Sequence, residues 1–198
     1  MSSATKLGKD VQALLVRHAE TEWTVSGRHT GRTDLPLTER GREAARALAP
    51  LVAGIEFSLV LVSPLQRARE TCELCGLGAL AQRRDELMEW DYGDYEGLTS
   101  AEIAERRTGW SLWRDGCPSG EDAAAVGLRA DRTIAELIAA TGPVAVFSHG
   151  HVLRVIGARW IELGPQQGAR LTLSTGSLSR LGYEHGTRVL SGWNSSQI

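Results

Sequence analysis

Three short apolar runs in this 198-residue sequence each lead into arginine or histidine residues. The runs cover residues 11–16, 59–62 and 144–147. The arginines and histidines that follow them are Arg17, His18, Arg67 and His149. Such a set suits a phosphate monoester better than an acyl group, because a dianion needs several positive donors before a nucleophile can approach it. The residue types therefore predict phosphoryl chemistry.

His18 is the candidate nucleophile of this set. Arg17 and Arg67 can each offer a planar fork of N–H groups to phosphate oxygens, and their charges would depress the pKa of His18. A ring nitrogen would then stay unprotonated and nucleophilic. An isolated Arg-His pair is more often structural, so the prediction depends on the joint placement of these residues at three strand ends.

The elements that must position these residues follow from the pattern of apolar residues. Each run reads as a buried strand, and a helix over residues 38–53, with Thr38 as its N-cap, joins the first two strands as a βαβ unit. Ser63 and Pro64 are expected to begin a second helix, and a long helix over residues 121–140 precedes the third strand. Parallel strands end at one edge of a sheet, so we expect one crevice to collect the four residues.

The remaining segments predict walls of that crevice and the end of the sheet. Residues 24–37 form a glycine-rich and polar loop that leaves the same strand end as His18. Residues 85–97 mix acids, aromatics and glycines, which indicates an irregular segment over the site. Residues 99–120 are expected to be an insertion or lid, and residues 177–193 a hairpin. The prediction is one α/β domain over residues 1–198.

Composition limits the partners of the protein. The formal net charge is −2, with 42% hydrophobic and 23% charged residues, so no basic field favours nucleic acid or an anionic membrane surface. No apolar run approaches the roughly 20 residues that span a bilayer, and the first ten residues lack the apolar centre of a signal peptide. We expect a cytoplasmic protein that binds a small molecule, and a homodimer is compatible with the sequence.

Four motifs in order along the chain resemble the histidine phosphatase superfamily, which includes cofactor-dependent phosphoglycerate mutases and many small phosphatases. They are Arg17-His18-Ala19-Glu20-Thr21-x-Trp23, Ser63-Pro64-Leu65-x-Arg67-Ala68-x-x-Thr71, Glu89-x-x-Tyr92-Gly93-x-Tyr95-Glu96-Gly97 and Ser148-His149-Gly150. Two positions depart from the usual pattern. Ala19 replaces a glycine, and Thr24 stands where many members have asparagine, so one phosphate contact is in question.

The resemblance implies a fold and a set of roles. The fold is a three-layer α/β/α sandwich with a mostly parallel central sheet, as in phosphoglycerate mutases. His18 becomes phosphohistidine and Glu89 donates and accepts the proton. The phosphoryl oxygens are held by Arg17, Arg67 and His149. The expected substrate contacts are Thr24, Thr30, Gly31, Tyr92 and His151.

Within the family, residues 27–38, 116–121 and 149–151 look most like fungal sedoheptulose-bisphosphatase-type proteins and the bacterial acid phosphatases near them. That similarity implies hydrolysis of a small phosphorylated metabolite, with a sugar phosphate favoured. A cofactor-dependent mutase is an alternative, although the insertion over residues 99–120 is short for a segment that must exclude water. A non-catalytic regulator that binds a phosphorylated ligand is a second alternative, because a fold alone does not prove activity.

A metal centre is the weakest hypothesis, and we expect neither a metal nor another cofactor. The pair His149-x-His151 lacks an accompanying cluster of acids and histidines with ligand spacing. Cys72-x-x-Cys75 has no second pair, and Cys117 stands alone. These cysteines are predicted to be buried or half-buried thiols on helices. His151 is predicted to face the substrate or to cap a helix.

Overall fold

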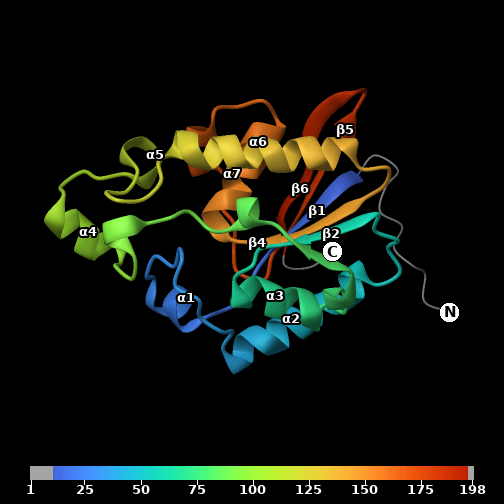
Figure 1. Cartoon of the computed structure of the whole chain (residues 1–198), viewed down its shortest axis with the longest axis horizontal. Helices are drawn as coiled ribbons and strands as arrows, with labels where there is room; N and C mark the ends of the chain where they lie inside the picture. Colours follow the sequence, from blue (N-terminus) through green and yellow to red (C-terminus); the bar gives the residue numbers. More distant parts are fainter. Residues whose placement is uncertain (1–10, 196–198) are drawn as a thin grey trace.

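The computed structural model describes residues 11–195, which are built around a six-stranded sheet in the order β3-β2-β4-β1-β5-β6 (Figure 1). The strands are β1 (Val11–Arg17), β2 (Leu59–Val62), β3 (Ala81–Arg83), β4 (Val144–Ser148), β5 (Leu178–Glu184) and β6 (Thr187–Ser195). β1, β2, β3 and β4 pair in parallel, and β5 and β6 add an antiparallel hairpin. The predicted α/β fold with a mostly parallel sheet is confirmed.

Helices cover both faces of the sheet and form the outer two layers. The helices are α1 (Glu22–Ser26), α2 (Glu39–Val52), α3 (Gln66–Leu74), α4 (Ser100–Arg106), α5 (Leu112–Asp115), α6 (Ala123–Ala139) and α7 (Gly150–Trp160). Short 3-10 turns are η1 (Gly78–Leu80), η2 (Asp85–Leu87), η3 (Gly93–Tyr95) and η4 (Pro165–Arg170). In Figure 1, α6 and α7 lie on one side of the sheet and α2 and α3 on the other, while α4 and α5 extend away from it.

The strands are apolar throughout because both of their faces are buried. Leu14 and Val16 of β1 pack with residues of α2 and α3, whereas Ala13 and Leu15 pack with residues of α6 and α7. Side chains alternate between the two faces of a strand, so a strand covered on both sides needs an unbroken apolar run. The apolar runs of β1, β2 and β4, which end at the candidate site residues, therefore form the centre of the core.

Local signals set most helix boundaries, with one exception at α3. Thr38 caps α2 by accepting a hydrogen bond from the backbone N–H of Gly41 at 2.9 Å, as predicted. The prediction that Ser63 and Pro64 begin α3 is wrong, because the helix begins at Gln66 and the Ser63 side chain turns toward the site. Within α6, Ile138 is 49% exposed and lies outside the buried face of the helix.

The C-terminal ends of the parallel strands are fixed to one another by backbone hydrogen bonds. Arg17 is in register with Ser148 across β1 and β4, and the N–H of His18 donates to the Ser148 carbonyl at 2.9 Å. The N–H of Ser63 donates to the Phe147 carbonyl at 3.0 Å, which ties β2 to the same edge. This edge carries the residues that the sequence predicts for the site.

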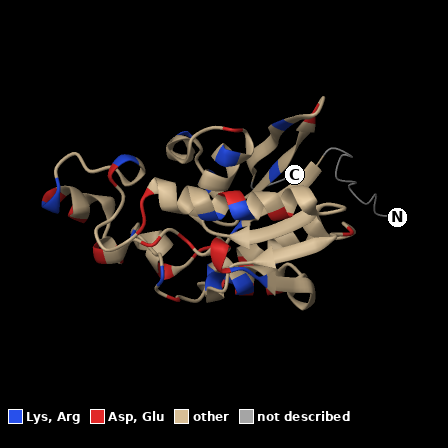
Figure 2. Ribbon diagram, turned by 45° about the horizontal axis from the view of Figure 1, so that its top comes forward, with Lys and Arg blue, Asp and Glu red and all other residues tan. Residues whose placement is uncertain are grey.

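Charge is distributed rather than concentrated. Figure 2 shows basic and acidic residues interspersed along the helices and loops. Within residues 11–195, none of the helices is long and apolar enough to cross a membrane.

The segment 24–37, predicted as a loop, begins inside the short helix α1 and continues as irregular backbone.

Candidate functional site

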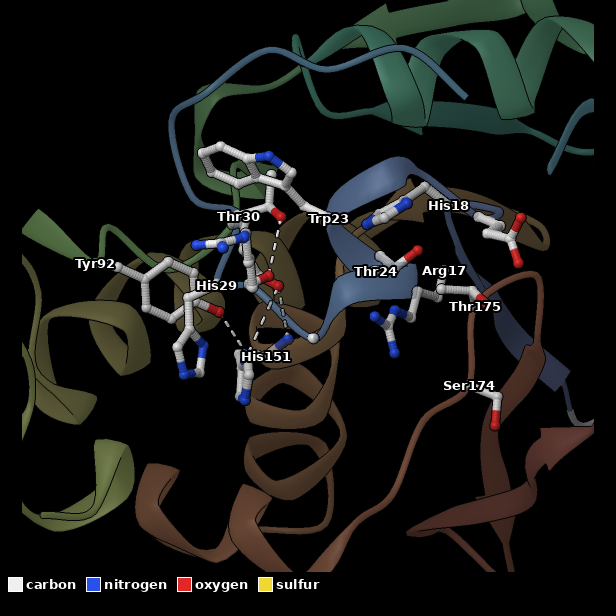
Figure 3. A pocket seen from close by; sticks show the side chains of 14 residues that line it. Arg17, His18, Trp23, Thr24, His29, Thr30, Tyr92, His151, Ser174 and Thr175 are labelled. Atoms are coloured by element: carbon white, nitrogen blue, oxygen red, sulfur yellow. Dashed lines mark hydrogen bonds and ion pairs between the residues drawn. The ribbon is translucent and has the colours of Figure 1, made fainter. Parts of the chain in front are cut away.

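A cavity of about 460 Å³ lies at the C-terminal ends of the parallel strands. The predicted residues on its wall are Arg17, His18, Thr24, Thr30, Glu89, Tyr92 and His151. In Figure 3, His18 and Arg17 lie on one side of this cavity and Tyr92 on the other. Arg67 and His149 are fully buried beside it, with the His149 ring centroid 5.2 Å from that of His18. The structure thus brings the four residues of the strand ends together.

His18 has one ring nitrogen bonded to the backbone. Its Nδ1 lies 2.8 Å from the carbonyl oxygen of Ala19, which can only accept, so Nδ1 carries the proton and donates it. Burial lowers the pKa of His18 well below 6.5, and the charges of Arg67 and Arg17 lower it further. The ring is therefore neutral near neutral pH and Nε2 holds a lone pair. This arrangement can act as a nucleophile.

Arg17 lies against the N-terminus of α7 with part of its guanidinium unengaged. Its Nη1 donates to the Leu173 carbonyl, while its buried Nε has no hydrogen-bond partner among residues 11–195. Gly150 permits this position, since a Cβ there would lie 3.2 Å from Cζ of Arg17. Burial lowers the pKa of Arg17 and the charge of Glu89 raises it. A buried donor without a partner is costly, so Nε is suited to an anion entering the cavity.

Arg67 is held in place by other protein groups. Its Nε donates to Nδ1 of His149 at 3.1 Å, and Nη1 donates to the Thr33 carbonyl at 2.9 Å. Its Nη2 donates to the carbonyls of Thr30 at 3.0 Å and Gly31 at 2.9 Å. Since a guanidinium has five N–H groups, one N–H on Nη1 has no assigned partner within the described chain. Arg67 therefore organises a loop as well as offering positive charge.

His149 connects Arg67 to Ser63. Its Nδ1 accepts from Arg67, and its Nε2 lies 2.7 Å from the Ser63 hydroxyl. Burial lowers the pKa of His149 well below 6.5, and the nearby charge of Arg67 lowers it further. In a neutral ring whose Nδ1 accepts, Nε2 must carry the proton and donate it to Ser63. Both ring nitrogens of this predicted phosphate contact are thus bonded to protein groups.

Glu89 caps the N-terminus of α7. Its Oε1 accepts from the backbone N–H groups of Trp90 at 2.9 Å and Val152 at 3.0 Å, and its Oε2 accepts from the His151 N–H at 3.0 Å. A helix N-terminus stabilises a carboxylate, which explains why an acid that is only 4% exposed is tolerated here. Oε2 has fewer donors than Oε1 and is the oxygen better able to carry a proton into the cavity.

Glu96 and Arg67 fix the two sides of the loop over residues 30–33. The Glu96 carboxylate accepts from the backbone N–H groups of Gly31 at 2.9 Å and Thr33 at 3.0 Å, whereas Arg67 binds the loop carbonyls. Sequence reasoning predicts that Gly31 touches substrate, but both of its backbone groups turn toward the protein. A Cβ at Gly31 would lie 2.6 Å from Glu96, so the glycine permits this close approach. Thr30 therefore lines the cavity, whereas Gly31 does not.

Tyr92 and His151 form the opposite wall. The Tyr92 oxygen lies 2.6 Å from His151 Nδ1. Burial raises the pKa of Tyr92 well above 10.0 and lowers that of His151 well below 6.5, so both groups are neutral and the phenol donates to Nδ1. The His29 ring packs on Tyr92 with centroids 4.7 Å apart. This wall is aromatic and uncharged.

Several residues of the cavity wall are not among the site residues singled out from the sequence. They are Glu20, Trp23, Gly27, Arg28, His29, Ser174 and Thr175. Glu20 and Trp23 lie inside the first motif, and Gly27, Arg28 and His29 lie inside the loop predicted to form a wall of the crevice, so the sequence carried a local signal for these five. Thr24 reaches the cavity, but its hydroxyl donates to the Thr21 carbonyl at 2.8 Å, which engages its proton within α1.

The structure offers little to a metal ion. Across residues 11–195, no group of three or more His, Cys, Asp or Glu side chains is arranged as a metal site. His149 bonds to Arg67 and Ser63, as described above. Cys72 and Cys75 are buried free thiols whose pKa is raised to about 12 by burial, and Cys117 is buried in a loop rather than in a helix. These thiols do not face the cavity.

Comparison with known sequences identifies relatives of this chain. Residues 13–196 match a family model described as the histidine phosphatase superfamily (branch 1). An acid phosphatase of Mycobacterium tuberculosis is 40% identical over 89% of each chain. A sedoheptulose 1,7-bisphosphatase of Saccharomyces cerevisiae is 36% identical, over 79% of this chain and 69% of that protein. A 2,3-bisphosphoglycerate-dependent phosphoglycerate mutase of Gloeobacter violaceus is 34% identical, over 78% and 77%.

Solved structures show the same architecture. The product of an open reading frame of Mycobacterium tuberculosis superimposes with a TM-score of 0.88 and 39% identity, covering 93% of this chain and 98% of that one. A mycobacterial glucosyl-3-phosphoglycerate phosphatase gives a TM-score of 0.82 and 27% identity, covering 92% and 98%.

Proposed function

Because this chain belongs to branch 1 of the histidine phosphatase superfamily and is a phosphatase, we propose that it hydrolyses a small phosphorylated metabolite through a phosphohistidine on His18. The observation that carries the proposal is the state of the His18 ring. Ala19 holds the proton on Nδ1, and burial together with the neighbouring arginines keeps the ring neutral. Nε2 is then the atom that attacks phosphorus.

Arg17 and Arg67 would bind the phosphoryl group. Arg17 offers its unpartnered Nε, and Arg67 offers the remaining N–H of Nη1. Both guanidinium groups lie in a water-poor site, where a fixed positive charge stabilises the charge that develops on the phosphoryl oxygens more strongly than in water. His149 would join them as a phosphoryl contact after exchanging one of its present partners.

Glu89 would supply the leaving group with a proton and then activate water. His18 cannot do so, because its nucleophilic nitrogen is occupied by the phosphoryl group. The backbone donors at the start of α7 hold the Glu89 carboxyl in one orientation, with Oε2 the freer oxygen. In the second half of the reaction the same carboxylate accepts a proton from the attacking water, which releases phosphate.

The cavity supports a small substrate, and a sugar phosphate in particular. Its volume of about 460 Å³ falls within the range typical of metabolite sites. Beyond the phosphoryl end, Trp23 and Tyr92 offer aromatic faces, and Ser174 and Thr175 supply hydroxyl groups. Aromatic faces and hydroxyls are suited to a polyhydroxylated carbon chain. The names of the bisphosphatase and glucosyl-phosphoglycerate phosphatase relatives agree with this class.

We assign the whole chain to one domain in which residues 99–120 are an insertion. This segment contains only α4 and α5. A mutase must keep water away from its phosphoenzyme, and a short insertion favours hydrolysis. Mutase activity is nonetheless the second candidate, because the Gloeobacter relative carries that name.

A phosphate-release screen tests the proposal. Purified protein is incubated with a panel of phosphorylated metabolites that includes sugar phosphates, and 3-phosphoglycerate is tested with and without 2,3-bisphosphoglycerate. We expect release of inorganic phosphate from at least one sugar phosphate, and no release by His18→Ala. Isomerisation of 3-phosphoglycerate without release would favour the mutase. No turnover of any substrate would favour a binding protein.

A further inference from the structure

Ser63 is a fully buried residue that joins two neighbouring strands at the site. It follows β2, and its backbone N–H donates to the Phe147 carbonyl of β4, the adjacent strand in Figure 1. Its hydroxyl lies 2.7 Å from Nε2 of His149 and also accepts from the N–H of Leu65 at 3.3 Å. The serine is therefore fixed in position while its hydroxyl contacts the histidine.

His149 cannot bind a phosphoryl oxygen in the hydrogen-bonding state seen here. Its Nδ1 accepts from Nε of Arg67, and its Nε2 donates to Ser63. A phosphoryl oxygen accepts hydrogen bonds, so it needs a proton on whichever nitrogen meets it. Because Nε2 faces Ser63, the nitrogen at the phosphoryl end is Nδ1, which has no proton. Binding of a phosphoryl oxygen therefore requires the His149 proton to move from Nε2 to Nδ1, or a second proton to be added to the ring.

The surroundings of His149 oppose a second proton. The charged or titratable groups near it are Arg67, His18, Arg129 and Arg17, which are basic. Positive neighbours disfavour an imidazolium, and so does burial. A neutral ring can instead exchange tautomers, provided that the partner of Nε2 can both accept and donate a hydrogen bond. A serine hydroxyl can do both.

We propose that Ser63 is a positioning residue whose hydroxyl reverses its hydrogen bond to His149 when a phosphoryl group binds. In the free protein, Nε2–H of His149 donates to Ser63, and Nδ1 of His149 accepts from Nε of Arg67. With the phosphoryl group bound, Nδ1–H donates to a phosphoryl oxygen and Nε2 accepts the Ser63 O–H. One proton leaves Nε2 and one arrives at Nδ1 by exchange with water, so the ring stays neutral. Nε of Arg67 is released to bind the same phosphoryl group.

This inference depends on the proposed phosphoryl site, and histidine NMR on the wild-type protein separates the two. The ¹⁵N shifts of His149, assigned by their loss in His149→Asn, are recorded with and without inorganic phosphate. We expect Nε2–H in the free protein and Nδ1–H in the complex. Phosphate that binds without moving the proton, or that protonates both nitrogens, overturns the switch but leaves the site. Absence of phosphate binding overturns both.

Variants of two buried serines test the same inference by activity. Ser63→Ala removes the hydroxyl that can both accept and donate a hydrogen bond to Nε2. We expect the inhibition constant of phosphate to rise and kcat/KM to fall, each by about 10- to 100-fold, whereas Ser63→Thr keeps most activity. Ser148→Ala is the matched control, because Ser148 is equally buried but donates to the Leu87 carbonyl at 2.6 Å. Equal losses in Ser63→Ala and Ser148→Ala would show that Ser63 contributes only to packing and would contradict the proposal.

Discussion

The two ends of the cavity are built differently. At the phosphoryl end, side chains come from strand ends and from the start of a helix, and protein groups bind them: Ala19 holds His18, and three backbone N–H groups hold Glu89. At the outer wall, Trp23 and His29 come from α1 and the loop after it: the His29 ring packs against Tyr92 and Trp110, and the Trp23 ring lies against Gly97. The difference indicates that the chemistry is preorganised by the sheet, whereas substrate preference depends on segments that can vary without disturbing it.

The largest effect is expected from removing the proton donor of the phosphoryl end. Glu89→Gln should slow hydrolysis of an alkyl phosphate by about 10²–10⁴-fold and that of p-nitrophenyl phosphate far less, because the second leaving group is stable as an anion. Burst kinetics at the phosphorylation step would measure both rates. Glu86→Gln, which changes an acid paired with Arg132 outside the cavity, is the control. Equal losses on both substrates would mean that Glu89 only positions the phosphate.

The next effect concerns the arginines. Arg67→Ala should lower kcat/KM by about 10²–10³-fold, because it removes a preorganised donor and also frees the carbonyls of the loop over residues 30–33. Arg17→Lys should cost less, since lysine keeps the charge but not the planar fork. Steady-state kinetics give both values, with Arg69→Ala on the same helix as the control. Nearly full activity of Arg67→Ala would place this arginine outside the phosphoryl machinery.

A smaller and more selective effect is expected at the outer wall. Trp23→Ala should raise KM for a sugar phosphate about two- to tenfold, which corresponds to an aromatic contact of roughly 0.5–1.5 kcal/mol, and should leave kcat for p-nitrophenyl phosphate almost unchanged. Val25→Ala is the control, because Val25 is a neighbour on α1 that is 67% exposed. A large fall in kcat for both substrates would contradict the claim that the outer wall affects substrate binding and not the chemical step.

Both ends of the cavity contain histidines whose pKa is lowered by burial, and this predicts that the stability of the protein depends on pH. Burial lowers the pKa of His18, His149 and His151 below 6.5, so the unfolded chain binds more protons than the folded chain in acid. Their contribution is fully present above pH 6.5 and is lost as the pH falls, at up to roughly 1.4 kcal/mol per pH unit for each histidine. Urea unfolding at pH 7.5 and 5 should show this decline, and His18→Ala should make it shallower. Equal free energies of unfolding at the two pH values would contradict it.

The sequence predicted the phosphoryl end better than the outer wall for a physical reason. A strand buried on both faces must be apolar, so a polar residue at its end is visible in the sequence, and Arg17, His18 and His149 were found in this way. A serine before a proline favours a helix cap, so the sequence predicts that role for Ser63, and only tertiary contact reveals its bond to His149. Ser174 and Thr175 had no signal, since they reach the cavity through the path of the chain before β5.

The most direct test of the central claim is to trap the phosphoenzyme. Protein is mixed with a labelled phosphate monoester, quenched in alkali during the burst and mapped by mass spectrometry. We predict one base-stable, acid-labile phosphoryl group on His18 in the wild-type protein and none in His18→Ala. A phosphoryl group on another residue, or label that persists in His18→Ala, would contradict the assignment of Nε2 of His18 as the nucleophile.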